Sequence, residues 1–162
     1  MLAWQQMKSQ LELILHNIRS SYNVGSIFRT ADGAGVAKVW PTGYTPAPLD
    51  QFKRVNGGLA KTALGAETSV SWEKRENVFD LIKELKKLGY QIWALEQNEK
   101  SVDYREAKLT SKTALVVGSE VGGVEAKILA KCDQIIEIPM KGQKESLNAS
   151  VATGVVVYKI LE

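Results

Sequence analysis

Short apolar runs alternate with amphipathic stretches along this chain. Between residues 77 and 89, apolar side chains recur at spacings of three and four, the period of a helix, whereas residues 113–118 are apolar almost throughout, as in a strand buried on both faces. These patterns predict strands at 11–16, 36–40, 90–95, 113–118 and 134–138, and helices at 24–34, 77–89, 125–131 and 147–160. The alternation indicates an α/β domain with a mainly parallel sheet and helices on both faces.

Local signals predict where these elements begin and end. Asn23 is a suitable N-cap for the first helix, and Ser146 suffices to cap the last one. Pro41 is expected to end the second strand. The last helix is expected to bury four apolar side chains: Leu147, Val151, Val155 and Tyr158.

The connecting segments are polar. Residues 42–68 are rich in glycine, contain two prolines and carry Lys53, Arg54 and Lys61, and they predict a long basic loop with a short helix near 58–64. A short strand is expected at 69–72, and residues 97–112 form a polar connection.

Composition narrows the class of protein. A chain of 162 residues with 44% hydrophobic and 24% charged residues is typical of one globular domain, and its net charge of +3 permits a polyanionic partner without requiring one. The single Cys132 and the single His16 argue against a disulfide, a metal cluster or a Ser-His catalytic pair. Cys132 is expected to be a small buried residue, and His16 a packed or surface histidine. Without a signal-length or membrane-length apolar run, we expect a cytoplasmic protein with no membrane contact.

Three polar loops, each between a predicted strand and a predicted helix, are candidate ligand sites. The first holds Asn23 and leads to Arg29, and the second is Gly-Ser-Glu-Val-Gly-Gly around Glu120. The third runs from Ile138 into a helix that opens with Ser-Leu-Asn-Ala-Ser, more small hydrogen-bonding groups than a cap requires. Each has a plainer interpretation: a helix arginine reaching water, an acidic residue near a helix N-terminus, and a well-capped helix.

Together, these loops resemble motifs 1, 2 and 3 of the SpoU (TrmH-type) branch of the SPOUT RNA 2′-O-ribose methyltransferases. The specific segments are Asn-Val-Gly-Ser-Ile-Phe-Arg-Thr-Ala-Asp at 23–32 and Ile-Pro-Met-x-Gly-x-x-x-Ser-Leu-Asn-x-Ser-Val-Ala at 138–152. Motif 2 departs slightly, with Ser119 and Gly122 where the family often has an asparagine and a basic residue. The resemblance covers residues 11–158, so we expect a single methyltransferase domain over 1–162 with no appended RNA-binding domain.

The resemblance implies a C-terminal trefoil knot, a homodimer, and transfer of a methyl group from S-adenosyl-L-methionine to a ribose 2′-hydroxyl of tRNA or rRNA, without a metal. It implies cofactor contacts from Leu95, Glu96, Gly118, Ile138, Met140 and Leu147. It assigns catalytic roles to Arg29, Asn23, Glu120, Ser146 and Asn148, with Arg29 activating the hydroxyl. Candidate phosphate contacts are Arg19, Lys53, Arg54 and Lys61, for which ordinary solvated charge is the alternative.

Two other functions predict different residues at these positions. A non-catalytic RNA-binding or assembly factor on the same fold is expected to lack Arg29 or the Ser146-Leu147-Asn148 run, and both are present. An unknotted dinucleotide-dependent oxidoreductase requires a glycine fingerprint after the first strand, and residues 14–19 contain no glycine.

Overall fold

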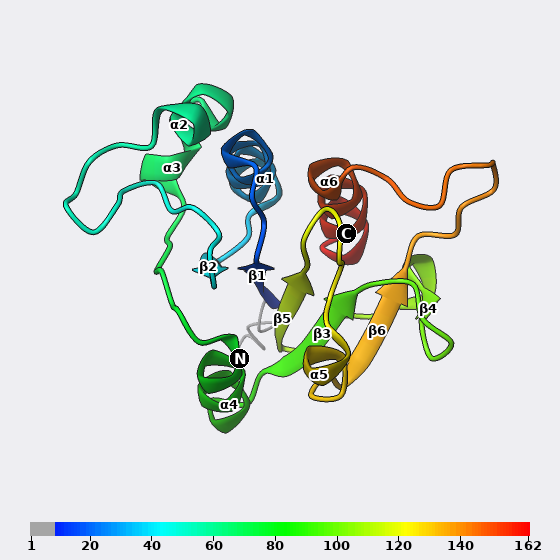
Figure 1. Ribbon diagram of the computed structural model, residues 1–162. Coiled ribbons are helices and arrows are strands. Elements are labelled where there is room, and N and C mark those ends of the chain that lie inside the picture. Colours follow the sequence, from blue (N-terminus) through cyan, green and yellow to red (C-terminus); the bar gives the residue numbers. More distant parts are fainter. Residues whose placement is uncertain (1–8) are drawn as a thin grey trace, which may run out of the picture.

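A six-stranded parallel sheet forms the centre of the computed structural model, which describes residues 9–162 (Figure 1). Its strands are β1 (Gln10–His16), β2 (Lys38–Thr42), β3 (Gln91–Leu95), β4 (Val102–Asp103), β5 (Lys112–Val117) and β6 (Gln134–Glu137). Their order is β2-β1-β5-β3-β6-β4, and every pairing is parallel. The predicted α/β architecture is therefore confirmed, and β4 is an additional short strand inside the segment predicted as a polar connection.

Helices cover both faces of this sheet (Figure 1). One face carries α1 (Ser21–Ala34), α2 (Gly57–Ala63), α3 (Ala66–Ser69) and α6 (Ala149–Ile160), and the other carries α4 (Val78–Lys87) and α5 (Ala126–Leu129). Alternating strand residues supply the two cores: Leu13 and Leu115 pack under the first group, and Ile14 and Val116 pack against the second. Both faces of the strands are thus buried, as their unbroken apolar runs predict.

The strand register brings four loops to one edge of the sheet. Leu15 pairs with Val117, Val117 with Leu95, and Leu95 with Ile136. Because all these strands run in one direction, the loops that follow β1, β3, β5 and β6 leave side by side, where open parallel sheets bind ligands.

Two helix starts differ from the prediction. Ser20, rather than Asn23, caps α1, and its hydroxyl accepts a hydrogen bond from the Asn23 backbone N–H at 3.1 Å. Asn148, rather than Ser146, caps α6 by accepting from the N–H groups of Ser150 and Val151. All four candidate side chains are good caps, so contacts distant in sequence select among them.

The predicted buried face of α6 is wrong. Tyr158, Val155, Val151 and Leu147 are all exposed, with Val155 at 38%. The side chains that pack inward are instead Thr153, Val156, Val157 and Ile160. The helix is apolar on nearly every side, so its sequence period does not identify the core-facing side.

Smaller differences lie around β2. Pro41 lies inside this strand instead of ending it, which is tolerated because β2 is at the sheet's edge. The short helix expected near 58–64 is confirmed as α2. The strand expected at 69–72 is wrong, because Ser69 ends α3 and Trp72 makes only an isolated bridge to Val39.

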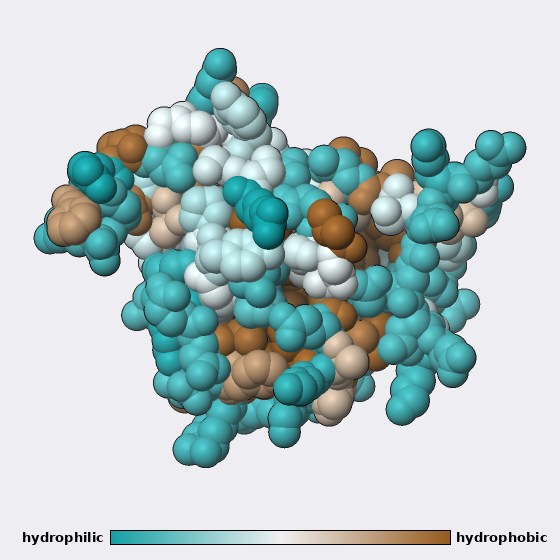
Figure 2. All heavy atoms as spheres, in the orientation of Figure 1, coloured by the Kyte–Doolittle hydropathy of each residue, from teal (hydrophilic) through white to brown (hydrophobic). Residues whose placement is uncertain are grey.

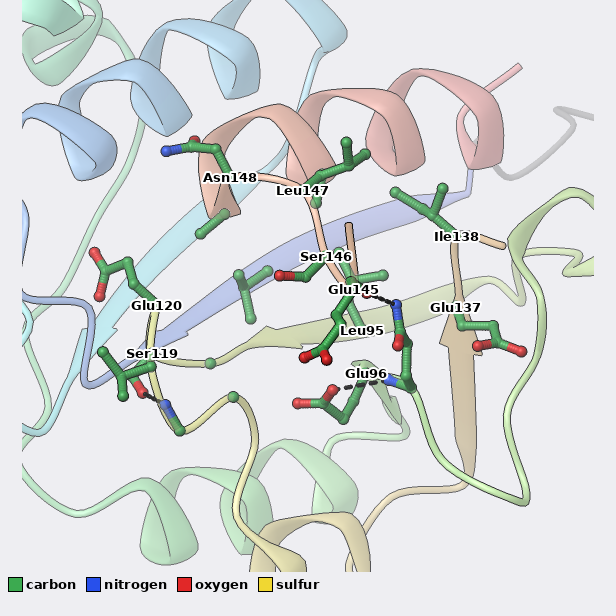
Figure 3. Close-up of a pocket in the computed structure, with 18 of the residues that line it drawn as sticks. Leu95, Glu96, Ser119, Glu120, Glu137, Ile138, Glu145, Ser146, Leu147 and Asn148 are labelled. Carbon is green, nitrogen blue, oxygen red and sulfur yellow. Dashed lines mark hydrogen bonds between the residues drawn. The ribbon is translucent and has the colours of Figure 1, made fainter. Parts of the chain in front are cut away.

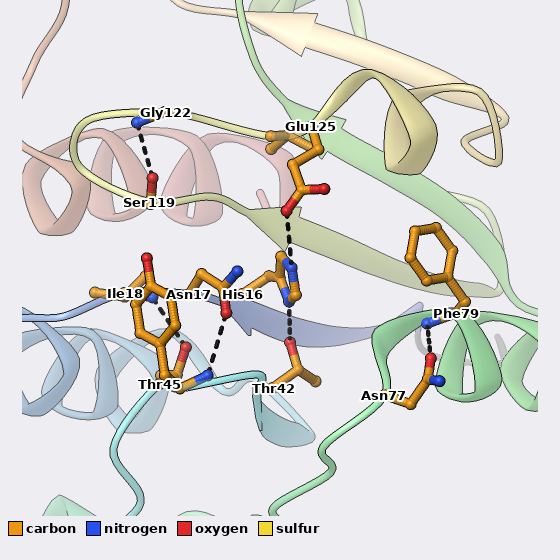
Figure 4. Close-up of polar contacts among 12 residues, drawn as sticks. His16, Asn17, Ile18, Thr42, Thr45, Asn77, Phe79, Ser119, Gly122 and Glu125 are labelled. Carbon is orange, nitrogen blue, oxygen red and sulfur yellow. Dashed lines mark hydrogen bonds and ion pairs between the residues drawn. The ribbon is translucent and has the colours of Figure 1, made fainter.

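Two buried titratable side chains join β1 to its neighbours. Glu12 accepts hydrogen bonds from the Trp40 indole at 2.6 Å and the Tyr90 hydroxyl at 2.7 Å. His16 ends β1, with Nδ1 2.9 Å from the Thr42 hydroxyl and Nε2 3.6 Å from the Glu125 carboxylate (Figure 4). Burial lowers the pKa of His16 by more than the attraction of Glu125 raises it. His16 is therefore packed, one of the two placements that its sequence position allowed.

Within residues 9–162, no helix combines the length and apolarity needed to cross a bilayer, and no three His, Cys, Asp or Glu side chains are grouped as metal ligands. Cys132 is half-buried, its thiol donates to the Ile128 carbonyl, and burial raises its pKa to about 11.

Candidate active site

A cavity of about 360 Å³ lies at the carboxyl edge of the sheet, among the loops that follow β3, β5 and β6 (Figure 3). This volume is in the range of small-molecule sites. Figure 2 shows hydrophobic atoms in a hollow of this face, bordered by hydrophilic side chains. The lining residues are Leu95–Gln97, Val117–Gly123, Glu137, Ile138, Met140, Glu145–Ala149 and Ala152.

The turn after β5 forms one wall. Ser119 and Gly123 exchange two backbone hydrogen bonds, at 3.1 and 3.0 Å, and the Ser119 hydroxyl accepts from the Gly122 N–H at 2.8 Å. A Cβ on Gly118 would meet the Gly123 carbonyl at 2.2 Å, so only glycine allows the two segments to approach this closely. Ser119 and Gly122, the departures from the family pattern, thus stabilise the turn from within.

Glu96 ties this turn to the loop after β3. Its Oε2 accepts from the Val124 N–H at 2.8 Å, and its Oε1 accepts from the Gln97 N–H at 2.8 Å. The Gln97 side chain in turn donates to the Glu145 carbonyl at 2.7 Å (Figure 3). The loop after β3 therefore holds both the turn after β5 and the loop after β6 in place.

Asn23 connects the three motifs. Its side-chain N–H donates to Glu120 Oε1 at 3.2 Å, and its Oδ1 accepts from the Asn148 amide at 3.3 Å. Glu120 also accepts from the backbone N–H groups of Arg19 and Ser20 at 3.3 and 3.2 Å. The start of α1, the turn after β5 and the cap of α6 thus meet at the edge of the cavity.

These contacts determine the charge of Glu120. Partial burial disfavours its ionised form, but hydrogen bonds from backbone N–H groups and from Asn23 outweigh burial and hold the pKa of Glu120 below its usual range. The cavity therefore has a fixed negative charge beside Asn23 at neutral pH.

Arg29 lies apart from this network. It is exposed on α1, six residues after Asn23, which places it about 9 Å further along the helix axis. It does not line the cavity. On neighbouring α6, Val151, Val155 and Tyr158 are exposed apolar residues, and Lys159 is exposed next to Tyr158.

The sequence-predicted residues divide into three groups by position. All six expected cofactor contacts line the cavity: Leu95, Glu96, Gly118, Ile138, Met140 and Leu147. Of the expected catalytic residues, Glu120, Ser146 and Asn148 line it, Asn23 is hydrogen-bonded to two of these, and Arg29 lies outside. The four expected RNA contacts are exposed and none of them lines the cavity: Arg19, Lys53, Arg54 and Lys61.

Sequence reasoning missed three polar residues of the cavity. Gln97 follows Glu96 directly, and Glu137 and Glu145 flank the third loop. Their position beside the recognised motifs was the available signal, but none belongs to a motif by residue type.

The lining suits a nucleoside that carries positive charge. Leu95, Ile138 and Leu147 offer apolar surface for a flat base, and the glycine turn lets a ligand contact the main chain. The Glu96, Glu137 and Glu145 carboxylates supply acceptors for hydroxyl groups and negative charge. The residues present therefore fit S-adenosylmethionine.

Comparisons with known proteins agree with this geometry. A model of the SpoU rRNA Methylase family matches residues 10–158. The chain is 37% identical over 154 residues to a tRNA (guanosine(18)-2′-O)-methyltransferase of Aquifex aeolicus, a match that covers 94% of this chain and 70% of that protein. It is 34% identical over 158 residues to the 23S rRNA (guanosine-2′-O-)-methyltransferase RlmB of Haemophilus ducreyi, covering 97% and 61%. An AdoMet-bound rRNA methyltransferase from Sinorhizobium meliloti matches its fold with a TM-score of 0.85 at 25% identity, covering 94% of this chain and 56% of that one.

Proposed function

The chain belongs to the SpoU rRNA methylase family of S-adenosylmethionine-dependent RNA 2′-O-ribose methyltransferases, and we propose that it methylates a nucleotide of tRNA or rRNA as a homodimer. The observation that carries this proposal is the hydrogen-bond network of Asn23, Glu120 and Asn148 at the edge of the cavity. A buried core or a simple helix cap does not require three polar side chains from three distant loops to meet beside a cavity of this size.

The reaction sets two demands on the protein. S-adenosylmethionine, when bound, supplies a methyl group made electrophilic by its positively charged sulfur. A ribose hydroxyl is a weak nucleophile, so the protein must hold it in line with that methyl group and favour loss of its proton. In this proposal Leu95, Ile138 and Leu147 hold the cofactor's base.

The polar network positions the reactants. Glu120 is kept ionised by its N–H donors, so it holds the Asn23 amide in one orientation, and Asn23 in turn orients Asn148. Ser146, two residues before that cap, adds a hydroxyl to the same wall. We assign these four residues to positioning the ribose and the methyl donor.

Arg29 is assigned to activation of the hydroxyl. A guanidinium close to the 2′-oxygen stabilises negative charge as it develops there, and arginine does this while remaining protonated. Because Arg29 does not line the cavity of its own chain, we infer that it acts at the cavity of a second copy.

The exposed side of α6 supports the homodimer. Val151, Val155 and Tyr158 form an apolar stripe that a soluble monomer rarely leaves open, and Arg29 is exposed on adjacent α1. Burying this stripe against a second copy would remove its apolar surface from water and carry Arg29 toward the partner's site.

We also infer the trefoil knot. The last strand, β6, pairs between β3 and β4, so the chain must return into the interior of the sheet after β5. This supports threading through an earlier loop, which is rare in other folds.

The test is a methyl-transfer assay. The purified chain is incubated with unmodified total RNA and labelled S-adenosylmethionine, and the product is mapped by nucleoside analysis. We expect one 2′-O-methylated nucleoside, with the label lost in Arg29→Ala while S-adenosylhomocysteine still binds in calorimetry. Cofactor and RNA binding without any transfer would favour the non-catalytic RNA-binding factor instead.

A further inference from the structure

We propose that Tyr44, with the Arg19 guanidinium beside it, is a stacking platform for an unpaired RNA base at the edge of the cavity. The Tyr44 side chain is 54% exposed, and the Arg19 guanidinium lies 5.7 Å from its ring centroid. This inference rests on the proposed function and deepens it, because it specifies which kind of nucleotide the site accepts.

The main chain that carries Tyr44 is held from several directions. The Tyr44 N–H donates to Asn17 Oδ1 at 3.1 Å, and the Lys74 ammonium donates to the carbonyls of Gly43 and Thr45 on either side. The buried Thr45 hydroxyl accepts from the Ile18 N–H at 3.0 Å. Figure 4 shows Asn17, Ile18 and Thr45 together at the end of β1.

This anchoring has a conformational cost. Asn17 and Gly43 both adopt positive φ values, 56° and 60°, and the Asn17 Oδ1 lies where a Cβ on Gly43 would be. Lys74 is half-buried, and burial lowers its pKa because it disfavours the charged form. Such an arrangement is unnecessary for a solvated loop, but it fixes the direction of an exposed ring.

The platform lies next to the catalytic network. Arg19, which faces the Tyr44 ring, donates its backbone N–H to Glu120 Oε2 at 3.3 Å, and Glu120 lines the cavity. A single residue, Arg19, thus contacts both the exposed ring and Glu120 of the cavity lining. A base stacked on Tyr44 would belong to the target nucleotide or to its immediate neighbour.

The chemistry of the pair favours an unpaired base. An aromatic ring with an adjacent guanidinium stacks on the flat face of a base and also attracts the negative phosphates. In a duplex that face is covered by neighbouring bases, so the platform would accept a loop nucleotide or one turned out of a helix. A second copy of this chain is the rival occupant of the exposed ring.

Fluorescence tests this directly. The probe is a short stem–loop RNA with 2-aminopurine in its loop, and a fully paired duplex with 2-aminopurine in the stem serves as the comparison. We expect the wild type to quench the loop probe and not the duplex. Since base–aromatic stacking is worth about 1–3 kcal/mol, Tyr44→Ala should weaken loop binding by about 5- to 150-fold and remove the quenching, and Tyr44→Phe should restore both.

A matched control comes from the loop between β2 and α2. Phe52 is 68% exposed and has the Arg54 guanidinium 5.0 Å from its ring, but Arg54 pairs with Asp50, whereas Arg19 is bonded to Glu120 of the cavity lining. Phe52→Ala should leave 2-aminopurine quenching unchanged. Equal quenching by wild type and Tyr44→Ala would overturn the platform, as would a change of oligomeric state in Tyr44→Ala, which would identify the ring as a contact between copies.

The two proposals fail separately. Quenching that depends on Tyr44, without methyl transfer to any RNA, would support the platform and refute the methyltransferase. Methyl transfer by the wild type, with a KM for RNA that is the same in Tyr44→Ala, would support the methyltransferase and refute the platform. Binding of S-adenosylhomocysteine should be the same in all these variants.

Discussion

The side-chain N–H of Asn23 donates to the Glu120 carboxylate at 3.2 Å, across 97 residues of sequence. Removing the donor in Asn23→Ala should lower kcat by about 10- to 150-fold, because a hydrogen bond to a charged group contributes about 1.5–3 kcal/mol. The measurement is kcat with saturating RNA, alongside calorimetry with S-adenosylhomocysteine. Loss of cofactor affinity in parallel with kcat would show that Asn23 supports the cavity and not the reactants.

Asn23→Asp tests the charge and hydrogen-bond donor of this side chain without changing its size. The substitution keeps the shape of the side chain but places a second carboxylate beside Glu120 and removes the N–H donor. Repulsion between the two carboxylates should raise the pKa of Glu120, so activity should be lost most strongly at high pH, where both are ionised. A pH profile identical to that of Asn23→Ala would contradict this electrostatic role.

Arg29 is expected to act across the dimer. Arg29→Ala should reduce kcat by about 10²- to 10³-fold, as does removal of other groups that stabilise developing charge. Ala152→Phe, which inserts a ring into the cavity lining, should abolish cofactor binding. Each variant alone should have little or no activity, but a mixture that exchanges subunits should recover activity, because a mixed dimer pairs an intact cavity with the partner's intact arginine. If the mixture of exchanged subunits stays inactive, Arg29 acts at the cavity of its own chain and not at that of the partner.

The apolar stripe of α6 gives a test of the dimer itself. Val155→Glu should produce a monomer, because burying an unpaired carboxylate costs several kcal/mol. Val55→Glu makes the same chemical change at a valine that is 67% exposed on the loop before α2, and should leave the mass unchanged. Light scattering after gel filtration measures both. If Val155→Glu has the same mass in solution as the wild type, this face of α6 is not the dimer interface.

The turn after β5 has two adjacent glycines at which the same added methyl group should have different effects. Gly123 has φ +62°, and a Cβ there would meet Glu96 Oε2 at 2.0 Å, which is held by the Val124 N–H. Gly123→Ala should therefore cost about 1–2 kcal/mol in backbone conformation alone and weaken S-adenosylhomocysteine binding by about tenfold. At Gly122 the nearest atom to a Cβ is Ser119 Oγ at 3.3 Å, so Gly122→Ala should change binding little. Equal calorimetric affinities for the two variants would show that the turn does not shape the cavity.

Features that depend on a local sequence pattern were predictable, and features that depend on contacts between distant segments were not. The parallel sheet was predictable because uninterrupted apolar runs such as 113–118 leave little choice of environment. The buried side of α6 was not, because valines surround the helix and only its packing against α1 and the sheet selects Val156 over Val155. The candidate site was located through its motif segments, but a contact such as Gln97 to Glu145 joins loops 48 residues apart and leaves no local pattern. Tyr44 was missed for the same reason, since Asn17 and Lys74, which fix it, lie on other segments.

His16 should make the stability of the fold dependent on pH. Its neighbours are the Thr42 hydroxyl, the Glu125 carboxylate and, more distantly, the Lys74 ammonium, and burial lowers its pKa below 6.5. As pH falls below about 6.5, the imidazole of the unfolded chain takes up a proton before that of the folded chain, so the unfolded state binds more protons and the free energy of unfolding decreases. This loss ends once the pH falls below the lowered pKa of the folded state. In His16→Gln the contribution is absent, so urea unfolding between about pH 7.5 and 5 should show a smaller decrease than in wild type. An identical decrease in both proteins would assign the acid sensitivity to the carboxylates, and a larger decrease in the variant would show that His16 is protonated in the fold and stabilised by Glu125.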